Sequence, residues 1–449
     1  MKAWATALVL AASTIAAADP RPGQESGRVD PEATDDGDSI PRLVVRGVLF
    51  VPNLIVKAFF WPIEKGIWAF DRYQLAQRWH QLFWNDSDTI GLFPTVSLEA
   101  GFGLNAGAHL ALRDVFGAGE RVDLRASAGG RYQQRYLASA KTGSRLGNIV
   151  ALELYGEYER RPHDPFYGIG NIDDPEMIPP DPIAPIGGGV EARYRHDLLR
   201  TIGVVDFRLC SCLHVRVGGQ IADHQISGTD DDESIEARYD VGGLTGFADG
   251  NTAYYELEVR YDTRRTVRPI EPSSNPSMGG LVAVFGGRAH TFDNDVGTDY
   301  WRYGGDLQRF FRVTEGPRVI ILRGHLEGVT GGLGEVPFFD LPRLGGNNLR
   351  GYSSDRFRDR VGMVGSLDYR WDLSREYSAS LFVDVGRVYR KLEDVVLEDM
   401  RVGYGISLEA LSETSFRARI SLMSSIDGGV FVDFSLDPIF RTGERVQRK

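Results

Sequence analysis

The sequence lacks the features that mark several common classes of protein. It has two cysteines in 449 residues, Cys210 and Cys212, and we interpret them as two thiols or one local bridge without functional weight. Two cysteines are too few to staple a secreted scaffold. After the first residues there is no uncharged apolar run of about 18 residues, which excludes a transmembrane helix. The net charge of −11 argues against nucleic acid as a partner.

Catalytic motifs are missing as well. The sequence has no G-x-S-x-G, no H-E-x-x-H, no P-loop and no Cys/His cluster. Its eight histidines share no metal-ligand spacing. We therefore expect no enzymatic activity, no metal and no cofactor. A lipolytic barrel enzyme is the weakest alternative, because no Ser/His pair can be placed on one face. The acidic stretch 228–234 indicates a solvated loop rather than a divalent-cation site.

The N-terminus carries targeting and linker signals. Residues 1–18 predict a secretory signal peptide, with Lys2, an apolar stretch and the small residues Ala16, Ala17 and Ala18 before the expected cleavage point. Residues 19–42 are acidic and rich in Pro and Gly. A segment of that composition cannot bury a core, so we expect a disordered linker.

Residues 43–90 combine aromatic and basic side chains. Pro52 and Pro62 divide this segment into pieces too short to span a bilayer. The pattern predicts amphipathic helices that lie in the membrane interface, or a plug that packs on the rim of a larger domain. Both readings stay open at this point. The expected interfacial anchors are Trp61, Trp68, Trp79 and Trp84.

From residue 91 to about 440 the polarity alternates with period two. In YYELEVRYD, Tyr255, Leu257 and Val259 share one face and the charged residues share the other. Such segments repeat about sixteen times, without helices between them, although 189–209 can be one strand or two. The pattern predicts an all-β fold: an antiparallel transmembrane β-barrel with lipid on its apolar face and a polar lumen.

One long polar stretch, LPRLGGNNLRGYSSDRFRDR (341–360), interrupts this alternation. Together with the strands GSLDYRW and LFVDVG that follow, and with PFYGIGN upstream, it resembles the BamA/TamA-like outer-membrane assembly factors, also called bacterial surface antigens. The resemblance implies a barrel of 16 strands, an internal loop (330–361) that folds back into the lumen, and a loop-tip motif. That motif consists of Leu349, Arg350, Gly351 and Tyr352.

The resemblance also implies a partner for the loop arginine. In this family the arginine pairs with the Asp of an FxDxG phrase, which is Asp384 here, and Asp368 is a second candidate. The alternation places both carboxylates on the lumen face, and an unpaired guanidinium there would be costly. Gly345 and Gly346 would permit the reversal of the loop.

The C-terminal strand fits an insertion signal of outer-membrane barrels, with a glycine followed by alternating hydrophobic residues. Its expected members are Gly429, Val432, Phe434 and Phe440. The basic tail 441–449 departs from that pattern.

At the other end, the 72 residues from 19 to about 90 show no POTRA pattern, so the chain looks like a barrel without these periplasmic domains. The family resemblance implies a function in the outer membrane of a Gram-negative cell. The expected function is to assist the insertion of proteins or lipids into that membrane, or their passage across it. The alternative is a passive or gated transport pore. The expected partners are outer-membrane lipids, lipopolysaccharide and client outer-membrane proteins.

Overall fold

The computed structural model describes residues 81–99, 103–114, 116–129, 133–147, 149–171, 191–247, 250–265, 276–292, 298–312, 318–332, 334–372, 377–411 and 417–437. The chain divides into two units, Met1–Tyr73 and Gln74–Lys449, and all described residues belong to the second. The expected signal peptide, linker, most of the aromatic segment and the basic tail therefore lie outside the described residues.

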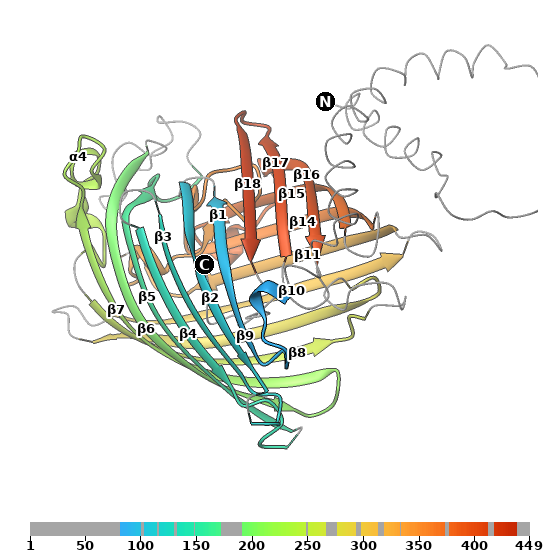
Figure 1. The fold of residues 1–449 in the computed structure, drawn as a ribbon. Helices are drawn as coiled ribbons and strands as arrows, with labels where there is room; N and C mark the ends of the chain where they lie inside the picture. Colours follow the sequence, from blue (N-terminus) through green and yellow to red (C-terminus); the bar gives the residue numbers. More distant parts are fainter. Residues whose placement is uncertain are drawn as a thin grey trace, which may run out of the picture. The chain divides into compact units, whose positions relative to one another are not determined.

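Within the described residues, sixteen strands form one antiparallel sheet that closes into a barrel (Figure 1). Neighbours in sequence are neighbours in the sheet, except that β11 pairs with β14. Between those two, β12 (Arg343–Leu344) and β13 (Phe357–Arg358) form a separate hairpin. The barrel strands are β1 Ile90–Glu99, β2 Gly103–Arg113, β3 Arg121–Gly129, β4 Gln133–Lys141, β5 Val150–Phe166, β6 Ala192–Arg208, β7 Leu213–Gly228, β8 Gly250–Asp262, β9 Gly279–Phe292, β10 Asp299–Arg312, β11 Arg318–Val329, β14 Val361–Asp372, β15 Tyr377–Tyr389, β16 Arg401–Leu411, β17 Arg417–Ser425 and β18 Val430–Asp437.

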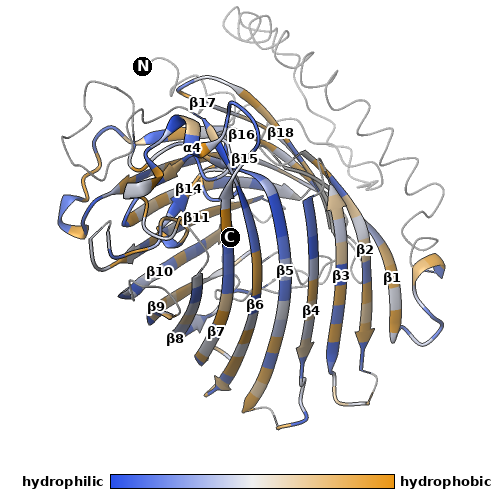
Figure 2. Cartoon of the chain, turned by 90° about the vertical axis from the view of Figure 1, so that its left-hand side faces the viewer, coloured by the Kyte–Doolittle hydropathy of each residue, from blue (hydrophilic) through white to orange (hydrophobic). Residues whose placement is uncertain are grey.

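Side chains alternate between the two faces of this sheet. On β8, Leu257 is exposed on the outside whereas Glu258 is buried inside, and on β15 Leu381 and Asp384 are divided in the same way. Figure 2 shows this alternation as bands of hydrophobic and hydrophilic colour along the strands. Because the outward positions are apolar and many inward positions are charged, the outer face suits lipid and the inner face suits a polar lumen.

Strand length varies around the barrel, and the lengths of the connections differ between its two ends. β5 and β6 have 17 residues each and β7 has 16, whereas β18 has 8. A tilted strand of about 9–11 residues crosses a bilayer, so β5 to β7 extend beyond it. The three longest connections (167–191, 229–249 and 330–360) leave one end of the barrel, and the connections at the other end are shorter, from 209–212 to 263–278. In outer-membrane barrels the long loops are extracellular and the short turns periplasmic.

The described part of the seam between β1 and β18 is short. β1 pairs with β2 at ten positions and β17 pairs with β18 at eight. Across the seam the described residues pair at three positions, which are Val96 with Leu436, Ser97 with Ser435 and Leu98 with Phe434. Among the described residues, this junction therefore has the fewest paired positions in the wall.

The strands differ from the sequence-based expectation in two places. Where the pattern leaves one or two strands open, residues 192–208 form the single strand β6. Where the pattern predicts no strand, β4 is present. Its outward residues include Ala138 and Ala140 and its inward residues include Ser139, so the contrast between its faces is too weak for the period to be seen. Because β4 adds one strand and the single strand β6 removes one, the total of sixteen strands is unchanged.

The apolar core lies inside the barrel, between the wall and the connections. Tyr155 and Tyr300 of the wall pack with Val336 and Leu341, which belong to the connection 330–360. A second cluster joins Phe166 and Phe338 with residues of other long connections. α4 (Ile235–Arg238) contributes Ile235 to it. Among the described residues, no helix has the length and apolar character needed to cross a bilayer.

Candidate functional site: a loop anchored in the lumen

The connection 330–360 returns into the barrel instead of extending into solvent. It begins after Val329 at the end of β11, contains the 3-10 turn η4 (Phe338–Asp340) and the hairpin β12–β13, and ends at Val361. Its apolar side chains include buried ones: Phe338 and Leu344 are 1% and 2% exposed, and Leu349 is fully buried. We call this connection the internal loop.

Two adjacent glycines reverse the loop at its tip. Gly345 and Gly346 have φ angles of 126° and 57°, which favour glycine over residues with a side chain. A Cβ atom on Gly345 would lie 2.1 Å from the carbonyl oxygen of Ser353. The reversal is closed by a hydrogen bond of 3.1 Å from the Gly346 amide to the Tyr352 carbonyl. This turn brings Arg350 toward the wall.

Arg350 lies between the two acids that the sequence proposes as its partners. Its Nε donates to Asp384 Oδ2 at 2.7 Å and its Nη2 donates to Asp384 Oδ1 at 2.6 Å. Its Nη1 donates to Asp368 Oδ1 at 2.8 Å, and its backbone amide donates to Asp384 Oδ2 at 2.9 Å. The guanidinium also stacks on Phe382, with 3.7 Å from Cζ to the ring centroid. The structure therefore brings these three charged residues together, in the bidentate geometry that arginine favours.

The charges of the two carboxylates stabilise the protonated, cationic form of Arg350 despite its burial. Asp384 is 1% exposed and Asp368 is 8% exposed, so both carboxylates are largely removed from bulk solvent. Burial alone would lower the pKa of Arg350, but the hydrogen bonds and charges of Asp384 and Asp368 outweigh it and raise that pKa. Removal of the arginine would leave two buried carboxylates facing each other without a cation. The three residues form what we call the lumen clamp.

The other residues of the loop motif secure the tip on both sides of the clamp. Leu349 packs in an apolar cluster with Leu344, Phe357 and Val388. The Tyr352 hydroxyl donates to Asp427 Oδ2 at 2.8 Å, which ties the tip to the connection between β17 and β18.

At Gly351 the loop backbone touches the barrel wall. Its φ angle is 94°, and a Cβ atom there would lie 2.2 Å from the carbonyl oxygen of Ser424. The wall has a matching glycine, Gly403, where a Cβ atom would lie 1.6 Å from the Arg350 carbonyl oxygen. The close approach of loop and wall thus depends on two glycines, one on each side of the contact.

A second anchor holds the base of the internal loop, and sequence reasoning missed its residues. Arg358 is 1% exposed, lies over the rings of Phe166 and Phe338, and accepts a 2.7 Å hydrogen bond at its carbonyl from the Gly170 amide. Asn171 exchanges two hydrogen bonds with the backbone of Val388, of 2.6 and 3.0 Å. The phrase PFYGIGN contains these upstream partners, but nothing in the sequence alone pairs it with residues so far along the chain.

The tryptophans expected at the membrane interface divide into two groups. Trp61, Trp68 and Trp79 lie outside the described residues. Trp84 is described, and at 6% exposed it cannot reach lipid headgroups. It packs on the buried ring of Phe93, with centroids 5.2 Å apart, and the Arg113 guanidinium lies 4.4 Å from its ring centroid. The interfacial position is therefore wrong for Trp84, which packs in a buried cluster with Phe93 and Ala111 of β1 and β2 instead.

The expected insertion signal lies at the seam strand. Gly429, with a φ angle of 86°, directly precedes β18. Val432 faces outward and is 47% exposed, and Phe434 pairs in register with Leu98 across the seam. Phe440 lies outside the described residues.

Beside the lumen clamp the structure contains a polar chamber of about 240 Å³. Arg350, Arg370 and Arg419 contribute to its lining, and the Ser407 and Ser421 hydroxyls hydrogen bond to each other at 2.8 Å. The described residues contain no group of three or more His, Cys, Asp or Glu side chains that could hold a metal ion. The chamber can hold water and small ions, and the clamp beside it positions a loop rather than a reacting group.

A family model matches the part of the chain that contains this site. Residues 213–422 match the Omp85 superfamily domain, and this range includes the whole internal loop and both partners of Arg350. The resemblance drawn from the loop motif is thereby confirmed at the level of the superfamily. No curated protein sequence matches the chain.

Solved structures of bacterial barrels resemble the fold. One is BamA from Haemophilus ducreyi lacking POTRA domains 1–3, at 15% identity and a TM-score of 0.53, with 78% of this chain and 70% of that chain covered. Another is CdiB from Acinetobacter baumannii, at 12% identity and a TM-score of 0.50, with 78% of this chain and 60% of that chain covered. This chain thus spans less than two thirds of the length of that CdiB. At such identities the likeness shows the fold, an outer-membrane type of β-barrel.

Proposed function

Because residues 213–422 carry an Omp85 superfamily domain, we propose that this outer-membrane β-barrel assists the insertion of other proteins into the outer membrane, or their passage across it. The role is physical and involves no bond chemistry. The proposed partners are client outer-membrane proteins and the lipids around the barrel. Residues 1–18 would direct export, and residues 43–90 would act as a plug or as a segment in the membrane interface.

The observation that carries this proposal is the difference in the number of described paired positions between two strand junctions of the barrel wall. The described seam pairs at three positions, whereas β14 and β15 beside the internal loop pair at twelve. A closed sheet leaves no free edge in lipid, because each unpaired backbone group in hydrocarbon costs several kcal/mol. A seam with few hydrogen bonds lowers the cost of exposing an edge.

An opened seam would present two strand edges within the membrane. The backbone groups of β1 that lose their β18 partners could pair with a strand of the incoming client, as an exposed edge does in β-augmentation. Each new hydrogen bond would replace one that was broken, so the seam can open without a large net loss.

The lumen clamp would keep the rest of the barrel intact during this opening. Arg350 ties the loop tip to β14 and β15 through Asp368 and Asp384. Tyr352 extends the tie to Asp427, next to the seam strand. In this account the internal loop works as an inner brace, so that opening stays confined to the one weak junction.

A transport pore is the second candidate, and the charged lumen favours it. Arg302 pairs with Glu327 at 2.9 Å and Arg419 with Asp433 at 3.2 Å on the inner wall, which suits a water-filled interior. The internal loop occupies part of that interior, so a pore of this design would be partly closed.

Reconstitution into liposomes separates the two functions. A urea-unfolded client barrel is added to vesicles with and without the protein, and its folding is followed by the gel shift of heat-modifiable barrels. Faster client folding in vesicles that contain the protein supports the proposal. A large, steady open conductance in planar bilayers, together with unchanged client folding, would refute it in favour of the pore.

A further inference from the structure

We propose that the outer face of β2 to β6 binds one anionic phospholipid-type molecule, with an acyl chain in a hollow of the wall and its phosphate on an arginine pair above it. The site lies on the outside of the barrel, and none of its lining residues belongs to the lumen clamp. It depends on the residence of the barrel in a membrane and not on client insertion, so the two proposals can fail separately.

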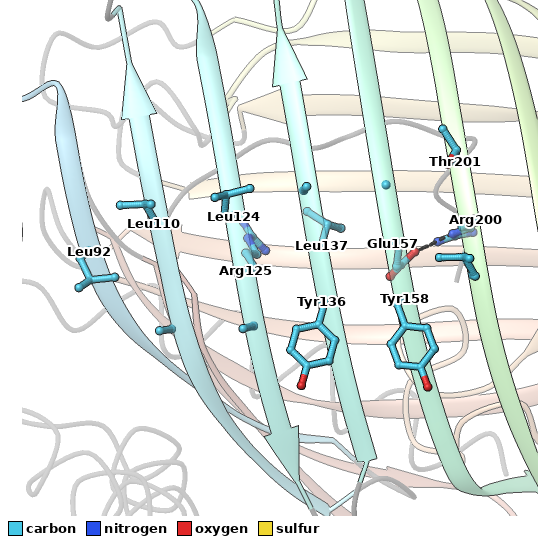
Figure 3. A pocket seen from close by; sticks show the side chains of 15 residues that line it. Leu92, Leu110, Leu124, Arg125, Tyr136, Leu137, Glu157, Tyr158, Arg200 and Thr201 are labelled. Atoms are coloured by element: carbon cyan, nitrogen blue, oxygen red, sulfur yellow. Dashed lines mark hydrogen bonds and ion pairs between the residues drawn. The ribbon is translucent and has the colours of Figure 1, made fainter.

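The hollow has a volume of about 560 Å³ and lies across several strands (Figure 3). Leu110 and Leu124 line one side of it, and Tyr136 and Tyr158 line the other. The two tyrosine rings stack with their centroids 6.2 Å apart, which fixes a flat wall rather than two loose side chains. An apolar hollow in a face that contacts lipid will be filled by hydrocarbon rather than by water.

Missing side chains create this hollow. Ala138 and Gly156 are paired neighbours on β4 and β5 at its floor, where Leu or Val would be usual on a lipid-facing surface. A Cβ atom on Gly156 would meet no atom within 4 Å. Elsewhere on the outer wall, outward positions of β8 carry Leu257 and Tyr261, both at least half exposed. The outer wall is thus recessed at β2 to β6 and filled at β8.

Charged residues begin directly above the hollow, at the long-loop end of the strands. The next outward residue after Tyr158 on β5 is Arg160, which is paired in register with Asp197 of β6. Arg195, two residues further on the same face of β6, donates to Asp197 Oδ2 at 2.5 Å. The change from apolar to charged residues on neighbouring strands marks the level of the lipid headgroups.

This arginine pair is not fully satisfied by the protein. Two cations share one carboxylate, so the cluster keeps a positive charge. The contact of Arg160 with Asp197 is long, at 3.9 Å between Nε and Oδ1. The Arg160 and Arg195 side chains are 36% and 42% exposed, so they can take up an anion from outside. A phosphate is the anion that suits the flat donor geometry of arginine.

The position of the two features selects the ligand. A free phosphate ion would bind the arginines without using the hollow, and a neutral lipid would fill the hollow without using the arginines. A lipid whose phosphate headgroup carries a net negative charge uses both, with its headgroup at the extracellular end and its chain along the wall. The choline cation of a zwitterionic headgroup would offset the attraction of its phosphate to the two arginines. The tyrosine hydroxyls lie between these levels, as in the aromatic belts of barrels.

Native mass spectrometry of the folded protein, titrated with dipalmitoyl phosphatidylglycerol or dipalmitoyl phosphatidylcholine, tests the site. Wild type should bind the first phosphatidylglycerol about tenfold more tightly than phosphatidylcholine, which corresponds to one charge-assisted contact. Arg160→Gln should remove this preference. Gly156→Leu should weaken the first binding step for both lipids about tenfold, because the new side chain fills the hollow.

Matched controls exist on β9. Gly286 is also a strand glycine at which an added Cβ atom would meet nothing within 4 Å, and Arg288 is an outward arginine that is 56% exposed and paired with Asp299. Gly286→Leu and Arg288→Gln should leave both affinities unchanged. Equal effects of the control and test substitutions, or no preference for phosphatidylglycerol in wild type, would overturn the site. If Gly156→Leu does not fold, as judged by heat-modifiable mobility, the Arg160→Gln result decides.

Discussion

The wall around the internal loop and the wall at the seam are built from the same kind of strand but are held in opposite ways. β14 and β15 pair along twelve positions, and their lumen face carries the clamp of Arg350, Asp368 and Asp384. β1 and β18 pair at three described positions. Within the described residues the two junctions thus differ in their number of paired positions, and side-chain ion pairs reinforce the longer one.

The largest expected effect comes from removing the arginine of the lumen clamp. Arg350→Ala should destabilise the barrel by about 3–5 kcal/mol, since it leaves two buried carboxylates without a cation. Unfolding in urea, followed by heat-modifiable mobility, measures the loss. Asp384→Ala should also destabilise, and the double variant should be no worse than Arg350→Ala, because the residues act as one unit. Fully additive losses would contradict the clamp. The exposed pair of Arg288 and Asp299 is the control: Arg288→Ala should cost less than about 1 kcal/mol.

A pH dependence of stability should come from the end of the internal loop. Burial of Asp359 raises its pKa to about 6, and this outweighs the opposing hydrogen bond and charge of Arg360. Because the folded pKa lies above the unfolded value of about 3.9, the folded state binds the proton more tightly. The stabilisation is therefore complete below about pH 4 and is lost as the pH rises through about 6, by about 2–3 kcal/mol.

Asp359→Asn should flatten this pH dependence and leave the seam unaffected. Urea midpoints between pH 4 and pH 8 provide the measurement. If Asp359→Asn keeps the wild-type dependence of the urea midpoint on pH, the titrating group is a different residue.

The glycine contact between loop and wall should have a smaller effect. Gly351→Ala has to accommodate a φ angle of 94° and a Cβ atom 2.2 Å from the Ser424 carbonyl oxygen, so we expect a loss of about 1–3 kcal/mol. Gly286→Ala, where an added Cβ atom has open space, is the matched control and should change stability little. If the two variants have equal urea midpoints, the loop tip does not depend on close backbone contact.

The smallest effect is expected at the second anchor. Asn171→Ala removes two hydrogen bonds to the Val388 backbone and should cost about 1–2 kcal/mol. It should also increase protease cleavage within the internal loop of folded protein. Unchanged cleavage would show that the lumen clamp alone holds the loop.

The sequence was sufficient for the parts of this account that depend on local pattern. Period-two alternation placed Leu381 outside and Asp384 inside, and the loop motif directed attention to Arg350 and both carboxylates. β4 could not be found in this way, because Ala138, Ser139 and Ala140 give its two faces almost the same polarity. The orientation of Trp84 was not encoded locally either, since an amphipathic aromatic segment suits a lipid interface and a protein wall equally well.

Long-range contacts formed the other limit. The pairing of Asn171 with Val388 joins residues far apart in the chain, and only the closed barrel brings them together. The hollow on the outer face likewise depends on the pairing register of β4 with β5, which places Ala138 next to Gly156. A single sequence contains these residues but not their neighbours across the sheet.

A disulfide across the seam tests the central claim most directly. Ser97→Cys and Ser435→Cys, made in a chain in which Cys210 and Cys212 are replaced by Ser, introduce cysteines at paired positions of β1 and β18. Ser407→Cys with Ser421→Cys gives a matched cross-link between β16 and β17, where the native hydroxyls lie 2.8 Å apart. Client folding in liposomes should stop when the seam pair is oxidised, return on reduction, and continue with the control pair in either state. Full activity with an oxidised, verified seam cross-link would contradict the account.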